Sequence, residues 1–61
     1  MNWTLIAIDK MLQKLENGSS PEDARHEVAT WIWSYRNEMK CDDYIHTLSL
    51  LNRIQIQLER R

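Results

Sequence analysis

Glycine, proline and cysteine each occur once in the 61 residues of this chain, and phenylalanine does not occur at all. The single cysteine, Cys41, cannot form an intrachain disulfide, so no disulfide framework holds the chain together. A zinc site built from paired cysteines is excluded for the same reason. A lone core in so short a chain rarely contributes more than about 3–5 kcal/mol of stability. We therefore expect a second copy of the chain to complete the fold.

Long hydrophobic runs and a strong net charge are also missing. No apolar run approaches the roughly 20 residues that span a bilayer, so we expect no membrane segment. Eight Lys and Arg stand against nine Asp and Glu, a formal net charge of -1. Such a balance gives no general attraction to phosphate backbones or anionic lipids. These absences lead us to expect a cytoplasmic protein with no membrane segment, and they disfavour nucleic acid as a partner.

Helical periodicity runs through most of the chain. Apolar residues recur at three- and four-residue steps in three segments, which is typical of helices with one buried face. Asn17-Gly18 ends the first segment, because glycine accepts the left-handed conformation beyond a helix. Ser20-Pro21 begins the second, as an N-cap followed by proline at the first helical position. We expect one domain, residues 1–61, with helices at about 4–17, 21–40 and 43–59.

The link between the second and third helices is marked less clearly. No glycine or proline lies between Lys40 and Asp43. Two interpretations remain open: a tight turn with Asp42 or Asp43 as the N-cap, and one long bent helix. Short links place consecutive helices antiparallel. The predicted fold class is therefore all-α, either an up-down-up bundle of three helices or a helical hairpin, completed by homodimerisation.

The expected core follows from the same periodicity. Trp3 is expected to precede the first helix and to pack back on it, with Asn2 or Thr4 as the helix cap. The predicted core side chains are Leu5, Ile8, Met11 or Leu12, and Leu15 in the first helix; Ala24, Val28, Trp31, Ile32, Tyr35 and Met39 in the second; and Tyr44, Leu48, Leu51, Ile54 and Leu58 in the third.

The second and third helices carry more apolar side chains than one core can cover. Trp33 lies about 140 degrees around the helix from Val28 and so points away from the core. Apolar groups cover roughly two-thirds of the third helix, where a surface helix needs a stripe of about 100 degrees, which predicts that this helix is the most central. Surplus apolar surface favours an interface, most often a two-fold homodimer, although single exposed apolar residues are also normal in monomers. The predicted interface comprises Ala29, Trp33, Asn37, Ile45, Asn52 and Ile56.

Few residues could carry chemistry. Cys41 and His46 form no recurrent metal-ligand spacing, and the aspartates beside Cys41 disfavour its reactive thiolate. His26 and His46 each lack a second positioned group for acid–base catalysis. We therefore expect no catalytic residue, no metal ligand and no cofactor, and no enzymatic activity.

The leading functional hypothesis is a non-catalytic protein–protein interaction module, such as a regulator, inhibitor, adaptor or immunity-type factor, that acts as a homodimeric helical bundle. A small helical DNA-binding or transcription-associated regulator is the first alternative. The acidic Asp42-Asp43 at the start of the third helix disfavours it, because a recognition helix presents basic and amide side chains there. A purely structural assembly subunit is the second alternative.

Overall fold

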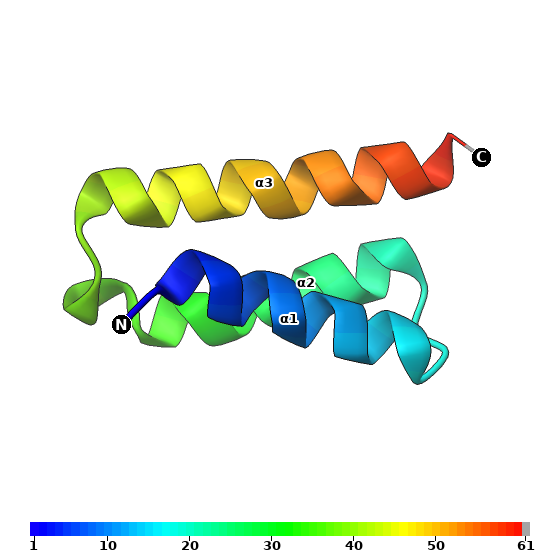
Figure 1. Cartoon of the computed structure of the whole chain (residues 1–61), viewed down its shortest axis with the longest axis horizontal. Coiled ribbons are helices and arrows are strands. Elements are labelled where there is room, and N and C mark those ends of the chain that lie inside the picture. Colours follow the sequence, from blue (N-terminus) through cyan, green and yellow to red (C-terminus); the bar gives the residue numbers. More distant parts are fainter. Residues whose placement is uncertain (61) are drawn as a thin grey trace.

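Three helices make up the fold in the computed structural model, which describes residues 1–60. They are α1 (Trp3–Glu16), α2 (Pro21–Ser34) and α3 (Cys41–Glu59), with a short 3-10 helix, η1 (Arg36–Glu38), between the last two. α1 and α2 form an antiparallel pair, and α3 lies along both and runs in the same direction as α1 (Figure 1). The predicted all-α fold is confirmed. None of these helices combines the length and the apolar character needed to cross a membrane.

The predicted helix ends are confirmed at three places. The Asn2 side chain accepts a hydrogen bond from the Leu5 backbone N–H at 3.2 Å and caps α1. Trp3 is therefore the first residue of α1, and the prediction that it precedes the helix is wrong. Ser20 Oγ accepts from the Asp23 backbone N–H at 3.1 Å and caps α2. Gly18 adopts a φ of 98 degrees beyond the end of α1. Only glycine enters that conformation without a steric cost.

The predicted boundary between the second and third helices is wrong. α2 ends at Ser34 and not near Lys40, and α3 begins at Cys41 and not at 43. The chain leaves α2 without glycine because Tyr35 and η1 tighten the last turn, and Met39 then follows in an extended conformation with its side chain buried. Lys40 is the N-cap of α3 and makes no side-chain cap bond. The two aspartates predicted as caps lie instead in the first turn of α3, where they face the positive end of the helix dipole.

The core is narrower than the periodicity predicts. In α2 the buried stripe is Ala24, Val28 and Ile32, at steps of four, and Trp31 and Tyr35 flank it. The corresponding buried positions of α1 are Ala7 and Met11. α3 contributes two residues to the buried set, Thr47 and Leu51, as many as α1 and one fewer than α2, so the prediction that α3 is the most central helix is wrong. The buried hydrophobic residues are Ala7, Met11, Ala24, Val28, Ile32, Met39 and Leu51.

On α1, Leu5 was predicted in the core and lies on the surface, and of the alternatives Met11 and Leu12 it is Met11 that is buried. Leu5 is 62% exposed and Leu12 is 48% exposed. Both lie about 100–120 degrees around α1 from Met11. The stripe that faces inward therefore centres on Ala7 and Met11, and the larger leucines are turned toward one side of the bundle.

A buried threonine connects α1 to α3. Thr47 Oγ1 donates to the Asp43 carbonyl oxygen at 2.7 Å and lies 2.9 Å from Thr4 Oγ1. Because the Thr47 proton is used in the first bond, the Thr4 hydroxyl donates the second. This contact sets the register, since Thr4 of α1 and Thr47 of α3 lie at the same height along the bundle.

The N-cap of α2 can be tested by substitution. Replacing Ser20 by Ala removes the acceptor for the Asp23 N–H, and we expect the free energy of unfolding to fall by about 0.5–2 kcal/mol. Ser19→Ala is the matched control, because Ser19 accepts no bond from the helix, and it should change stability by less than about 0.5 kcal/mol. Urea denaturation measures both values, and equal effects would contradict the assignment of the cap.

The threonine pair can be tested with a double-mutant cycle. Thr47→Val leaves the Thr4 hydroxyl without its acceptor, and we expect a loss of about 1–3 kcal/mol in the free energy of unfolding. Adding Thr4→Val should recover part of that loss, because no hydroxyl is then left unpaired. If the losses of the two single variants simply add in the double variant, the hydroxyls do not interact.

Candidate interaction surfaces

The three helices give the bundle three sides, which we name by the helices that border them: the α1–α2 surface, the α2–α3 surface and the α1–α3 surface. One contact between two helices shows, for each surface, which residues of those helices lie beside it. The Lys14–Glu27 ion pair lies on the first side, and the Arg25–Gln55 hydrogen bond lies on the second. The third side lies beyond the Thr4–Thr47 contact.

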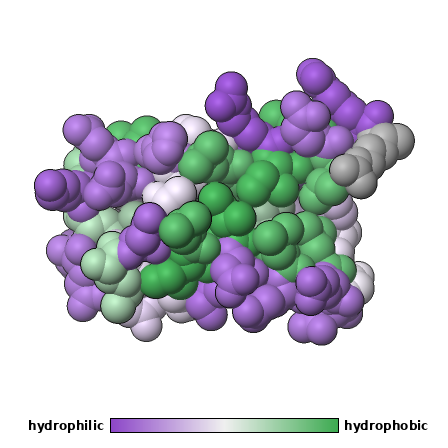
Figure 2. Space-filling view, viewed as in Figure 1, coloured by the Kyte–Doolittle hydropathy of each residue, from purple (hydrophilic) through white to green (hydrophobic). Residues whose placement is uncertain are grey.

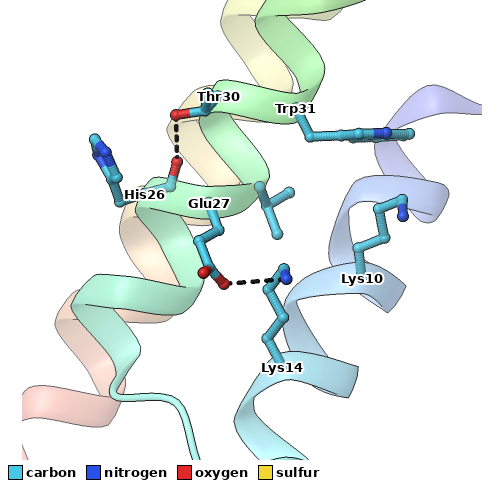
Figure 3. A pocket seen from close by; sticks show the side chains of 7 residues that line it. Lys10, Lys14, His26, Glu27, Thr30 and Trp31 are labelled. Carbon is cyan, nitrogen blue, oxygen red and sulfur yellow. Dashed lines mark hydrogen bonds and ion pairs between the residues drawn. The ribbon is translucent and has the colours of Figure 1, made fainter.

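The α1–α2 surface holds a shallow hollow of about 410 Å³, and most of the polar side chains that line it have partners. Lys14 Nζ lies 3.0 Å from Glu27 Oε2, and Lys10 Nζ lies 4.6 Å from the centre of the Trp31 ring (Figure 3). His26 lies at the rim with its ring directed away from Lys14 (Figure 3). Glu27 balances the charge of Lys14, and the Lys10 ammonium faces an indole ring. The hollow therefore holds no cluster of like charges that would attract a charged ligand.

An aromatic cluster closes the far end of the same side. The ring centres of Trp3 and Tyr35 lie 5.1 Å apart, as do those of Trp31 and Tyr35, and Trp3 lies 6.1 Å from Trp31. These are the tilted geometries that aromatic pairs favour. Trp31 and Tyr35, predicted in the core, are thus half-buried or exposed at its edge, where they cover one another.

The α2–α3 surface brings together most of the predicted interface residues. Ala29 and Trp33 lie 100–140 degrees around α2 from Val28, on the flank next to α3. Ile45, Asn52 and Ile56 lie at the same angles from Leu51 on α3, on the flank next to α2. A hollow of about 410 Å³ between the helices is lined by Arg25, Ala29, Tyr44, Leu48, Ser49, Leu51 and Asn52.

Three large apolar side chains on this surface are open to solvent. Trp33 is 53% exposed, Ile45 is 56% exposed and Ile56 is 40% exposed. Asn37 lies in η1 and not on the predicted continuation of α2, so the helical angle that grouped it with Trp33 does not apply to it. The structure therefore gathers five of the six predicted residues on one side of the bundle, and their role as an interface stays a prediction.

Trp33 is held in place by two neighbours. The Arg36 guanidinium lies 3.9 Å from the centre of the Trp33 ring, and its Nη1 donates to the Trp33 carbonyl oxygen at 2.8 Å. On the other helix, the Tyr44 ring centre lies 6.1 Å away. A cation over an indole face is an attractive interaction. The indole is therefore exposed but oriented.

The α1–α3 surface is apolar and was not predicted. Leu5 and Leu12 project from α1, and Ile8 is half-buried beside them. On α3, a shallow hollow of about 470 Å³ is lined by Leu50, Arg53, Ile54, Gln57 and Leu58. A hydrophobic band runs across this side between more polar edges (Figure 2). The sequence signal that could have predicted this surface is the spacing of Ala7 and Met11. If these two residues face the core, Leu5 and Leu12 must lie toward the outside of α1.

Residues of chemical interest do not converge. Cys41 and His46 are both exposed, and five residues along a helix separate two side chains by about 140 degrees. Within residues 1–60, no group of three or more His, Cys, Asp or Glu side chains is placed to hold a metal ion.

Comparison with known proteins gives no relative: no family model matches the chain, and no curated protein and no solved structure matches it.

The orientation of Trp33 can be tested by fluorescence quenching. In a variant whose only tryptophan is Trp33, made by Trp3→Phe and Trp31→Phe, we expect Arg36→Ala to raise the acrylamide quenching constant, because the guanidinium no longer covers one ring face. Lys10→Ala in the same background is the control, since Lys10 lies over Trp31. Equal quenching in the Arg36→Ala variant and its parent would show that Arg36 does not shield the indole.

Proposed function

We propose that this chain is a non-catalytic protein–protein interaction module, acting as a homodimeric helical bundle, that binds a partner protein on its α2–α3 surface. The observation that carries the proposal is the exposed Trp33, held between Arg36 and Tyr44. Trp, Tyr and Arg are the residues that most often dominate the energy of protein interfaces. An oriented aromatic side chain also loses less conformational entropy on binding than a mobile one.

The shape of the surface supports a helix as the partner element. Ala29 and Ser49 border the hollow between α2 and α3, and small side chains let another backbone approach closely. Ser49 Oγ donates to the Ile45 carbonyl oxygen at 3.0 Å, so its hydroxyl is satisfied within the helix. Trp33 and Ile45 stand beyond one end of this hollow, and Ile56 stands toward the other. An amphipathic helix lying in a groove uses anchors spaced in this way.

The charges beside the groove favour an acidic edge on that partner helix. Arg25 of α2 lines the hollow, and Arg36 of η1 lies over Trp33 at its end. The exposed Glu22 lies on the same flank of α2, at the end far from Trp33. Complementary charges at the rim of an interface raise the rate of association and select against wrong partners. The proposed partner is therefore an amphipathic helix with an apolar ridge and acidic residues along one side.

Neither alternative function has comparable support. For a DNA-binding regulator, the first turn of α3 carries Asp42 and Asp43, which would repel phosphates. For a purely structural subunit, self-association would be the whole role, and the oriented Trp33 on the α2–α3 surface would have no partner to meet.

Photo-crosslinking tests the proposal. A benzophenone amino acid at position 45, in cells that express the protein, should form a crosslink to one discrete chain. Mass spectrometry should place that crosslink in an amphipathic helical segment with an acidic edge. Because Trp33 is the proposed anchor, we expect Trp33→Ala to weaken binding of the identified segment by about 2 kcal/mol or more, measured by calorimetry with the purified peptide.

Tyr35→Ala is the matched control, since it removes an exposed aromatic ring on the side facing Trp3 and Trp31. It should leave the affinity for the peptide unchanged once a melting curve shows that the variant is folded. Unchanged affinity in Trp33→Ala, or crosslinks from position 45 to copies of this chain alone, would contradict the proposal.

A further inference from the structure

We propose that a second copy of this chain covers the α1–α3 surface, related to the first by a two-fold axis parallel to the helices. In this arrangement α1 of each copy lies against α3 of the other. The inference deepens the proposed function, on which it rests for the expectation of a homodimer. It also assigns self-association to a different side from the one that holds Trp33.

The apolar floor of this surface suits a protein partner. Leu5 and Leu12 project from α1, and Leu50, Ile54 and Leu58 line the hollow beside α3. A standard interface takes about 800 Å² from each partner, which is between a fifth and a sixth of the 4486 Å² surface of this molecule. One of its three long sides is large enough to supply that area.

Charges on the two edges of the surface have opposite signs. Asp9 and Glu16 are exposed on the outer flank of α1, about 140–160 degrees around the helix from Met11. Arg53 is exposed at the corresponding angle on α3, and Arg60, the exposed C-cap residue of that helix, lies about 180 degrees from Leu51. The α1 edge is therefore acidic, and the α3 edge is basic between Thr47 and the end of the helix.

The heights of these charges match. Thr4 and Thr47 are level, and both helices run in the same direction. At 1.5 Å per residue, Asp9 lies roughly 7.5 Å and Arg53 roughly 9 Å beyond that level. Glu16 lies roughly 18 Å and Arg60 roughly 19.5 Å beyond it, again about 1.5 Å apart.

This match selects one symmetry. Rotation about an axis parallel to the helices keeps every residue at its own height and exchanges the α1 and α3 edges. Asp9 of each copy then faces Arg53 of the other, and Glu16 lies at the height of Arg60 of the other. A two-fold axis across the helices would instead set α1 against α1, with acidic edges opposed, and like charges across an interface are unfavourable. Gln13 Nε2 donates to Asp9 Oδ2 at 2.9 Å, which leaves Oδ1 for a guanidinium of the partner copy.

Charge reversal tests this pairing. Asp9→Lys alone and Arg53→Glu alone should each raise the dimer dissociation constant by about tenfold or more, because each turns two symmetry-related attractions into repulsions. An equimolar mixture of the two variants should form a heterodimer as tight as the wild type or tighter. In that heterodimer one contact joins the introduced lysine to the introduced glutamate, and the other keeps the native pair.

A mixture that associates no better than either variant alone would overturn the parallel pairing. Sedimentation equilibrium over a wide range of protein concentration measures all three samples, and high salt should weaken the mixed dimer because the contacts lie at an exposed rim.

A second pair of variants identifies the surface. Leu12→Glu should convert a species of twice the 7.4 kDa chain mass into a monomer, whereas Ile45→Glu should leave it dimeric. Light scattering after size exclusion reads both, with circular dichroism as the check that each variant is folded. The opposite result, or a wild type that is monomeric at every concentration, would overturn this inference. Neither result would affect peptide binding at Trp33, so the two proposals fail separately.

Discussion

The narrow core shared by the three helices is the constraint on which the rest of the structure depends. Two of its fully buried hydrophobic residues, Ala7 and Ala24, are alanines, and few large side chains are buried with them. Met11, Ile32, Leu51, Val28 and Thr47 are the largest that are fully buried. Each helix can therefore turn only a narrow stripe inward. Many of the other apolar side chains therefore lie between neighbouring helices at the surface, where they form the apolar parts of the α1–α3 and α2–α3 surfaces.

The two apolar surfaces differ in ways that matter for recognition. The α1–α3 surface is aliphatic and bordered by opposite charges at equal heights, a pattern that complements itself under a two-fold rotation. The α2–α3 surface has an oriented indole, small residues at its hollow and arginines beside it. This pattern does not complement itself and suits a different protein. The α1–α2 surface is closed by its own ion pair and aromatic contacts. We therefore infer that self-association and partner binding use different sides of one small bundle.

The sequence predicted features that depend on local chemistry. Ser20-Pro21 and Gly18 marked helix ends because capping and a positive φ need those residue types. The end of α2 was missed because Tyr35 and a 3-10 turn leave the helix without either signal. On α2 the angle between Trp33 and Val28 correctly predicted that Trp33 lies on an exposed flank of the helix. On α1 the larger Leu5 was predicted in the core and Ala7 was not, although a narrow centre selects the smaller side chain. Which sides of three helices face one another depends on that packing, and periodicity alone does not specify it.

The single exposed cysteine offers the most direct test of the central claim, that a second copy lies parallel on the α1–α3 surface. A spin label at Cys41 marks the start of α3, and pulsed dipolar spectroscopy measures the distance between the labels of two copies. Cys41 lies on the α2 flank of α3, away from the proposed partner copy. A parallel dimer therefore separates the labels only across its width, and we expect a distance of at most about 30 Å, three helix spacings. An antiparallel dimer would also separate them along the helices by about 27 Å and give about 37 Å or more. That longer distance, or no dipolar coupling at all, would contradict the account.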